Sequence, residues 1–298
     1  MKLIIDQERA NSTEPRNPIA AALLSLFPGL GQIYNGQLIK GIVFLLIDLI
    51  TPVLFGISGM LLNINGLVAM LVVSVVFIIY RMADGFAVAK RLKEYELKPT
   101  NKWYVYLVFA LLTIGSRIFL DIPASTGIQT FKINTPSMAP TLEPGDRVVA
   151  QLYKYKKTEI QYGDIVVYNS PKGGVWTSRV IALPLDSIEV IDGIVSVNGQ
   201  VNEVKQNKEY ILDAQEVIEF EEELQNNKKI CTLRFKNNPY REGRTMANKF
   251  VPENEYFLMS DNRDDAFDSR FLGTIKKEDI VGKVIYSYWP NSSASENK

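Results

Sequence analysis

GDIVVYNSPKGGVWTSRVIALPLDSIEVIDGIVSVNG, residues 163–199, carries the clearest structural signal in the chain. Its β-branched runs are short, and glycine, proline, asparagine or aspartate stands between them, which is the pattern of strands joined by turns. One of these turns is Asp192-Gly193, between SIEVI and IVSVNG. An Asp-Gly pair in that position is typical of a two-residue β-hairpin. The segment therefore predicts consecutive antiparallel strands.

The same pattern continues on both sides of this segment. Short β-branched runs recur in DRVVAQLY at 146–153 and in GKVIYSYW at 282–289. Many short strands without a helical period predict an all-β domain, which we place at residues 124–290. Within it, residues 203–230 are more charged and predict an insertion with one strand or, as an alternative, a helix at 214–226.

Before residue 123 the composition is that of a membrane protein. Three long apolar runs occupy 41–61, 64–80 and 103–120, and their charged residues are Asp48 in the first and Arg117 in the third. A helix needs about 20 apolar residues to cross a bilayer, so these runs predict three transmembrane spans. The two charges are predicted to face the helix bundle or to reach the membrane surface.

Residues 18–37, PIAAALLSLFPGLGQIYNGQ, are less apolar and are interrupted by the proline and glycines of FPGLG. Helix breakers in this position predict an interfacial or re-entrant hairpin rather than a full span. The hairpin, the first two spans and a basic loop make up a predicted membrane domain at 18–102. The third span follows as an anchor at 103–123.

Positive charge indicates how the spans are oriented. Six lysines and arginines lie in the loop 81–102, and none lies at 58–66. Because Lys- and Arg-rich loops stay in the cytoplasm, the tail 1–17 and the loop are predicted to be cytoplasmic. Three spans then place the β domain on the extracytoplasmic side of the membrane. The C-terminal tail, 291–298, is predicted to be disordered.

Composition excludes several classes of function. The 298 residues contain 33 Lys and Arg against 33 Asp and Glu, and this neutrality argues against a nucleic-acid partner. The chain has no histidine, so a Ser-His-Asp triad, a Cys-His pair and a His-ligated metal are excluded. A single cysteine, Cys231, cannot form an internal disulfide. We therefore expect no metal and no cofactor, and chemistry that uses Ser, Lys, Tyr, Asp or Glu.

A serine in the segment NTPSMAPTLEPGD, residues 134–146, is a candidate nucleophile. Pro136 and Pro140 fix the backbone on either side of Ser137 and withhold two N–H donors, so the segment is predicted to be a rigid loop. A rigid exposed serine suits a nucleophile, and it also suits an ordinary turn. The neighbouring motifs decide between these interpretations.

Four motifs, SMAPTLEPGD, GDIVVYNSP, RVIALP and SDNRDDAFDSRFLG, follow one another behind the predicted anchor. In this order they resemble the bacterial type I signal peptidases, also called leader peptidases. The resemblance implies a membrane-anchored serine endopeptidase that removes signal peptides from exported proteins at Ala-x-Ala sites. It also implies a serine–lysine dyad, in which the lysine takes the serine proton. Separately, FPGLGQIYNGQLIKG makes residues 18–80 similar to a family of small two-helix membrane domains of poorly defined function.

The resemblance also implies roles for individual residues. The nucleophile is Ser137, and its own N–H and the hydroxyl of Thr135 form the oxyanion hole. Each such donor is worth roughly 3 kcal/mol in comparable sites. Met138 lines the substrate pocket. The ion pairs expected to shape the site are Asp261 with Arg179 and Asp268 with Arg270.

Two positions depart from the family pattern. Ser178 takes the place of the lysine base, and Ala266 takes the place of the serine that orients that lysine. A serine hydroxyl has no usable basicity, and loss of a general base costs about 10²–10⁴-fold in rate. The candidate replacement bases are Lys132, Lys172, Asp265 and Asp268, and spacing favours none of them.

Three hypotheses follow from this departure. The first is an active signal peptidase whose base has moved. The second is a catalytically impaired relative that acts as a signal-peptide-binding or accessory membrane protein. The third is a membrane scaffold in which residues 18–80 act and the β domain is a remnant, because a fold does not fix a function. The expected partners are membrane lipid and exported preproteins or their signal peptides, with the protein-export machinery as a further candidate.

Overall fold

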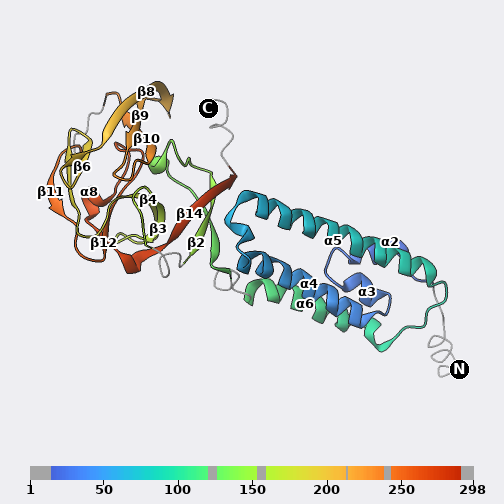
Figure 1. Ribbon diagram of the computed structural model, residues 1–298. Coiled ribbons are helices and arrows are strands. Elements are labelled where there is room, and N and C mark those ends of the chain that lie inside the picture. The colour runs from blue at the N-terminus through green and yellow to red at the C-terminus, as the bar shows by residue number, and fades with distance from the viewer. Residues whose placement is uncertain (1–14, 120–125, 153–158, 213, 238–242, 290–298) are drawn as a thin grey trace. The chain divides into compact units, whose positions relative to one another are not determined.

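The chain forms two compact units, Met1–Thr126 and Gly127–Lys298 (Figure 1). The predicted tail at 291–298 and most of the predicted tail at 1–17 lie outside the described residues. The computed structural model describes residues 15–119, 126–152, 159–212, 214–237 and 243–289.

The first unit is helical, and two of its helices are long and apolar enough to cross a membrane. These are α4 and α5, which run over Leu38–Ile57 and Ile64–Arg91. Few of their residues are buried within the unit, and many of their large apolar side chains are exposed. Such an apolar surface marks contact with a membrane or a partner. The third long helix, α6, covers Trp103–Phe119, and its apolar part is the shorter segment Trp103–Gly115.

Two short helices, α2 at Pro18–Leu24 and α3 at Leu30–Tyr34, occupy the segment predicted to form a hairpin. The side chain of Asn17 begins α2 by accepting two backbone hydrogen bonds, and Gly29, at φ 83°, lies between the helices. A Cβ at Gly29 would come within 2.2 Å of the carbonyl oxygen of Gly41 in α4. Glycine is therefore required here both for its conformation and for its size.

The structure corrects the prediction for Arg81, which the sequence places in a basic loop. Helix α5 continues beyond it, and Arg81 lies inside that helix with 2% of its surface exposed. Its guanidinium is 3.3 Å from the carboxylate of Asp48 and donates to the carbonyl of Leu26 at 3.0 Å. The apolar environment therefore holds this arginine against an opposite charge, as buried charges require. The side chain of Arg117 lies outside the described residues.

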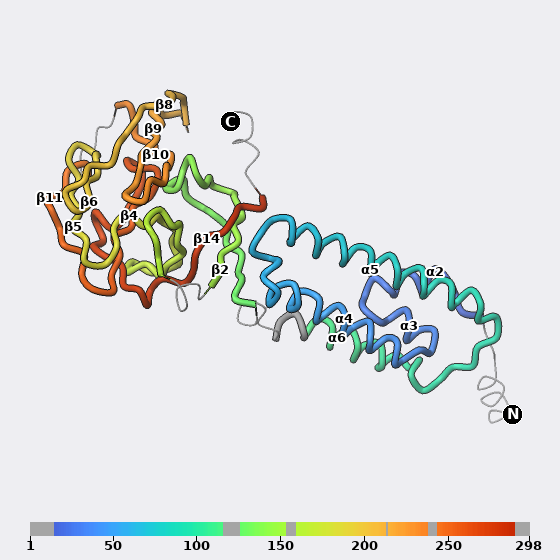
Figure 2. Tube along the Cα trace, viewed as in Figure 1, coloured from blue at the N-terminus to red at the C-terminus, as the bar shows by residue number. Residues whose placement is uncertain are grey.

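The second unit is an all-β domain, as predicted, built on antiparallel sheets (Figure 1, Figure 2). Its largest sheet has seven strands in the order β1-β2-β14-β3-β4-β12-β13, and two smaller sheets have the orders β10-β9-β8 and β11-β5-β6-β7. The strands of the large sheet are β1 Ile128–Lys132, β2 Arg147–Leu152, β3 Ile165–Asn169, β4 Val175–Ala182, β12 Glu255–Met259, β13 Ile275–Lys276 and β14 Ile280–Trp289. Those of the smaller sheets are β5 Ser187–Ile191, β6 Ile194–Val197, β7 Gln200–Val201, β8 Glu203–Leu212, β9 Gln215–Glu223, β10 Lys229–Phe235 and β11 Met246–Phe250.

The hairpin predicted from Asp192-Gly193 joins β5 to β6. Both turn residues have positive φ, 49° and 78°, as a type I′ turn requires. Ile191 and Ile194 pair directly on either side of the turn. The local turn chemistry and the pairing of the strands thus agree.

The helix considered for 214–226 is wrong, and so is the single strand expected at 203–230. This charged segment supplies β8 and β9 and leads into β10. Two of its carboxylates are buried: Glu219 is 6% exposed, and Glu222 of β9, 0% exposed, accepts from the Asn202 side chain at 2.7 Å and lies 2.8 Å from the Arg263 guanidinium. Glu222 is therefore a buried charge held by polar partners, whereas Glu209 and Glu216 lie exposed on the same sheet.

Strand β4 positions two of the residues that the sequence singles out. It is buried from Ser178 to Ala182 because one hydrophobic cluster packs on Val180 and another on Ile181. Successive residues of a strand point to opposite faces, so Ser178 and Arg179 enter different environments. The hydrophobic core thus fixes both side chains in place.

Candidate active site

Ser137 lies in a one-turn 3-10 helix, Pro136–Met138, whose backbone is held on both sides. Met138, 0% exposed, packs into a hydrophobic cluster with Ile133. The carbonyl of Ser137 accepts a hydrogen bond from the N–H of Asn262 at 2.9 Å. The serine side chain is partly exposed, so its hydroxyl is presented to solvent from a fixed backbone.

Thr135 precedes this turn with an extended backbone, and its hydroxyl oxygen lies 3.0 Å from that of Ser137. One of the two hydroxyls donates to the other. A threonine hydroxyl in this place can orient the serine or, when turned towards a substrate, donate to a developing oxyanion.

A pocket with a volume of about 750 Å³ opens beside these hydroxyls. Its walls come from the end of β1, the first half of β4 and the segment 260–271. A volume of this size is typical of ligand sites. The predicted site residues that line it are Ser137, Thr135, Met138, Ser178 and Ala266.

Ser178, where the resemblance implies a lysine, is 2% exposed and faces other hydroxyl groups. Its Oγ is 3.1 Å from the Oγ of Ser260. Burial raises the pKa of Tyr168 of β3 above its ordinary value, and the charge of Asp268 adds to this rise, whereas the interaction of Tyr168 with Ser178 acts in the opposite direction. The tyrosine hydroxyl therefore stays protonated, and this group of hydroxyls supplies no general base.

The sequence did not indicate Ser260 or Tyr168 as part of the site. Ser260 stands directly before the DNRD string and contributes its hydroxyl to the pocket wall. Ser178 pairs with Val166 in the β3–β4 ladder, so Tyr168, two residues further along β3, points to the same face. Strand alternation is the signal that places Tyr168 beside Ser178 once the pairing of the strands is known.

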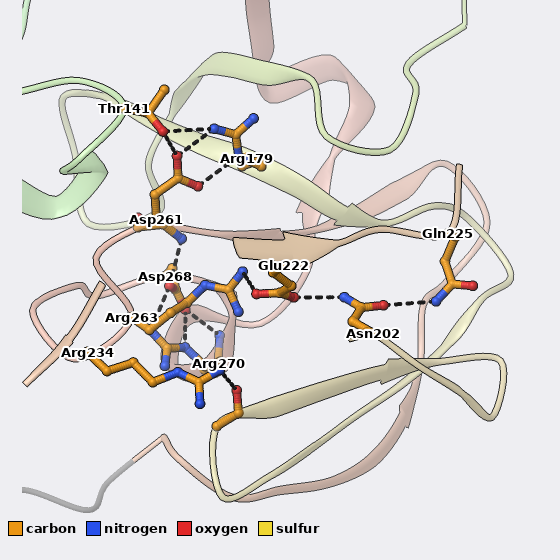
Figure 3. Close-up of polar contacts among 12 residues, drawn as sticks. Thr141, Arg179, Asn202, Glu222, Gln225, Arg234, Asp261, Arg263, Asp268 and Arg270 are labelled. Atoms are coloured by element: carbon orange, nitrogen blue, oxygen red, sulfur yellow. Dashed lines mark hydrogen bonds and ion pairs between the residues drawn. The ribbon is translucent and has the colours of Figure 1, made fainter. Parts of the chain in front are cut away.

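Arg179 leaves β4 on the other face and pairs with Asp261. Its Nε and Nη2 donate to the two carboxylate oxygens at 2.7 and 2.5 Å, and Thr141 donates to the same carboxylate (Figure 3). Burial by itself lowers the pKa of Arg179, but the charge of Asp261 outweighs it and raises the pKa overall. The pair is thus joined by two hydrogen bonds and closed to water, with Asp261 0% exposed.

The second predicted pair, Asp268 with Arg270, is also buried. The arginine Nε and Nη2 each donate to the carboxylate at 2.9 Å. The same carboxylate accepts from the N–H of Ser260 at 3.0 Å. Asp268 therefore holds Ser260, which in turn contacts Ser178. With its lone pairs engaged in this way, Asp268 is not available as a replacement base.

A third buried network escaped the sequence analysis. Glu222 lies between Asn202 and Arg263, and Arg234 donates to the carbonyl of Gly193 at 2.8 Å (Figure 3). These contacts connect the two smaller sheets with the segment that carries the DNRD string. The charged composition around Glu222 was the available signal, but composition does not show which charges meet.

The remaining candidate bases differ in position. Lys132 and Asp265 line the pocket, whereas Lys172 is exposed in the turn after β3 and does not line it. A carboxylate that was not predicted, Asp264, also lines the pocket. Among the described residues, no group of three or more Asp, Glu or Cys side chains could hold a metal ion.

Comparison with known proteins covers most of the second unit. The family model described as signal peptidase, peptidase S26, matches residues 101–289. Signal peptidase IB of Staphylococcus aureus is 29% identical over 209 residues, which cover 67% of this chain and 95% of that protein. The probable thylakoidal processing peptidase 2 of Arabidopsis thaliana is 30% identical over 173 residues, which cover 55% of this chain and 39% of that protein. A solved signal peptidase I from Enterococcus faecalis is 22% identical, covers 42% of this chain and 97% of that chain, and gives a TM-score of 0.26, too low to support a shared fold by itself.

Proposed function

Because the chain belongs to the signal peptidase family, peptidase S26, we propose that it is a membrane-bound serine endopeptidase that removes signal peptides from exported proteins. The observation that carries this proposal is the pocket in which the hydroxyls of Ser137 and Thr135 lie 3.0 Å apart. The nucleophile is Ser137, held on a rigid turn, and buried Met138 forms part of the wall beside it. The substrates are preproteins with small residues before the cleavage site.

Unpaired backbone beside the pocket supports binding of an extended peptide. Residues Val175–Ser178 of β4 pair with β3 on one side, and among the described residues β12 pairs with β4 only from Arg179 onwards. The other edge of Val175–Ser178 lines the pocket, opposite the segment 132–136. A peptide strand can add to such an edge through main-chain hydrogen bonds. A peptide bound in this way would lie in the pocket that Ser137 also lines.

In the proposed reaction, Ser137 Oγ attacks the carbonyl carbon of the peptide bond. The N–H of Ser137 and the hydroxyl of Thr135 then donate to the oxyanion, which costs little reorganisation because the turn is already rigid. The acyl-enzyme formed on Ser137 is released by water. The ion pairs Arg179–Asp261 and Asp268–Arg270 hold the walls of the pocket.

The proposed topology has three transmembrane spans after an interfacial hairpin, with the N-terminus in the cytoplasm and the β domain on the extracytoplasmic side of a bacterial inner membrane. Helices α4 and α5 support the first two spans. The five other basic residues of 81–102, all exposed, support the cytoplasmic assignment of that end. They are Lys90, Arg91, Lys93, Lys98 and Lys102.

Cleavage of a preprotein with an Ala-x-Ala site tests the proposed function. The purified chain in detergent is expected to release the signal peptide, and Ser137→Ala is expected to release none. The incubations extend to about pH 10, so that they span the titration of lysine. Absence of cleavage over that whole range would falsify the proposal.

A second function is favoured by the pocket wall, because Ser178 and Ala266 line it at the two positions where the resemblance implies a lysine and its orienting partner, and neither carries an amine. Without a base, the same cleft would bind signal peptides and not cleave them. In that case a signal peptide would bind wild-type protein and Ser137→Ala with equal affinity, and neither would cleave it. Equilibrium binding of a labelled signal peptide, measured beside the cleavage assay, separates the two functions.

Thr135→Val is expected to lower kcat for preprotein cleavage by about 10²–10³-fold with little change in KM, because loss of one oxyanion donor has this cost in other serine proteases. Thr135→Ser keeps the hydroxyl and is expected to keep most of the activity. Thr130→Val, at an exposed position of β1 outside the pocket, is the matched control. Equal kcat values for Thr135→Val and wild type would show that the Thr135 hydroxyl does not contribute to the oxyanion hole.

A further inference from the structure

The pocket needs a group that accepts the proton of Ser137, and its hydroxyl cluster does not contain one. The hydroxyl of Ser178 is hydrogen-bonded to that of Ser260, and burial raises the pKa of Tyr168. The inference below rests on the proposed function, because it concerns the base of the same reaction. The remaining source of a base is the set of titratable side chains that line the pocket, which are Lys132, Asp264 and Asp265.

Two of these three groups are poorly suited to the task. Asp264 is 2.8 Å from the Arg244 guanidinium and accepts from the N–H of Phe235 at 3.0 Å, so its lone pairs are engaged. Asp265 is an exposed carboxylate, and carboxylates in general bind protons far more weakly than amines. We propose that Lys132 is the general base that activates Ser137.

Lys132 lines the pocket from the end of β1. Lys132 is the last residue of β1 and is exposed, whereas its neighbours Phe131 and Ile133 pack into the hydrophobic cluster under Ser137. Ile133 is fixed by hydrogen bonds from its N–H to the carbonyl of Asp146 and from Gly145 to its own carbonyl. The strand end that carries the lysine and the turn that carries the serine are therefore both rigid, five residues apart.

The Lys132 amine is also not engaged elsewhere. Among the described residues, it makes no ion pair or side-chain hydrogen bond with another group. The charged groups that face it are Arg147, its partner in the β1–β2 ladder, and Asp264 and Asp265 on the pocket wall. A peptide that fills the pocket excludes water from this lysine, and loss of water favours the neutral amine that a base must be.

The proton transfers balance with this single amine. Neutral Lys132 Nζ takes the proton of Ser137 while the serine oxygen bonds to the carbonyl carbon and the carbonyl electron pair moves to its oxygen. The tetrahedral intermediate then breaks its C–N bond, and the ammonium returns the proton to the leaving nitrogen. Water attacks the acyl-enzyme in the same way, with the amine taking the water proton and returning it to the serine oxygen.

Lys132→Met and Lys132→Arg test this role, with Lys172→Met as the matched control for loss of an exposed lysine. Both Lys132 variants are expected to lower kcat by about 10²–10⁴-fold with KM little changed, because arginine stays protonated and cannot act as a base. The wild-type rate is expected to rise with pH towards the range in which lysine amines lose their proton, near ~10.4 in model peptides. This rise should be absent in Lys132→Met, and added methylamine should restore part of the rate of that variant.

A second readout does not need turnover. A fluorophosphonate probe bonds covalently to an activated serine, and Ser137→Ala sets its background. Slower labelling of Lys132→Met than of wild type supports the inference. If labelling is slowed in this way but no preprotein is cleaved, only the proposed function fails. Cleavage or labelling with the same rate and pH profile in wild type and Lys132→Met overturns the inference while the proposed function stands. Wild type that neither cleaves nor labels up to about pH 10 overturns both.

Discussion

Replacing Arg179 by methionine is expected to destabilise the β domain by about 3–5 kcal/mol, because it leaves a buried carboxylate without its counter-charge. Asp261 is 0% exposed and accepts two hydrogen bonds from this guanidinium. The methionine fills most of the space of the arginine stem, so the loss is one of charge rather than of packing. The remaining hydrogen bond from Thr141 cannot neutralise the carboxylate.

Hydrogen exchange of the full-length protein in detergent measures this loss at the site, because β4 and β12 exchange only when the core of the domain opens. Their amides are expected to exchange between about 10²- and 4 × 10³-fold faster, since 1.4 kcal/mol corresponds to a factor of ten. Arg147→Met, at an exposed arginine of β2, is the matched control and is expected to change exchange little. The double variant Arg179→Met with Asp261→Asn should regain much of the protection, because it removes the stranded charge. If the double variant regains no hydrogen-exchange protection, the pair stabilises the domain through packing and not through its charges.

Local sequence signals predicted those parts of the fold that depend on neighbouring residues. The Asp192-Gly193 turn specifies its own hairpin through positive φ, and the β-branched runs around it specify strands. The order of motifs, rather than any strand pattern, brought Ser137 together with Ser178 and Ala266, which lie far apart in the chain and share one pocket. Resemblance to a family therefore supplied the long-range part of the site.

The features that were not predicted from the sequence all depend on contacts between distant segments. The single-strand prediction failed because β9 pairs with both β8 and β10, and because Glu222 of β9 is buried against Arg263 from a distant segment. The loop prediction failed for Arg81 because its charge is matched by Asp48 in another helix. The contact between Ser178 and Ser260 likewise becomes visible only once β4 and the segment after β12 lie side by side. Charge in a sequence shows that a partner is needed and does not show which residue provides it.

Restoring the missing amine is expected to produce the largest gain in activity. The double variant Ser178→Lys with Ala266→Ser should cleave a preprotein about 10²–10⁴-fold faster than wild type near neutral pH, which is the usual contribution of a positioned base. Both positions line the pocket together with Ser137. Position 178 is 2% exposed, so the new amine is desolvated, and desolvation brings a lysine towards the neutral form that can accept a proton.

The two substitutions are expected to depend on one another. In Ser178→Lys alone, the new amine has the hydroxyl of Ser260 as a neighbour. Ala266→Ser adds a second hydroxyl that orients the amine. The cleavage rate of the double variant should therefore exceed that of Ser178→Lys. Adding Ser137→Ala must abolish the gain, because the amine acts only through that hydroxyl. A pH profile gives the sharpest check: the rate of the double variant should level off near neutrality, whereas the wild-type rate keeps rising into the alkaline range. If the double variant shows intact hydrogen-exchange protection of β4 and gains no activity, then Ser137 does not meet a substrate carbonyl in this pocket and the site lies elsewhere.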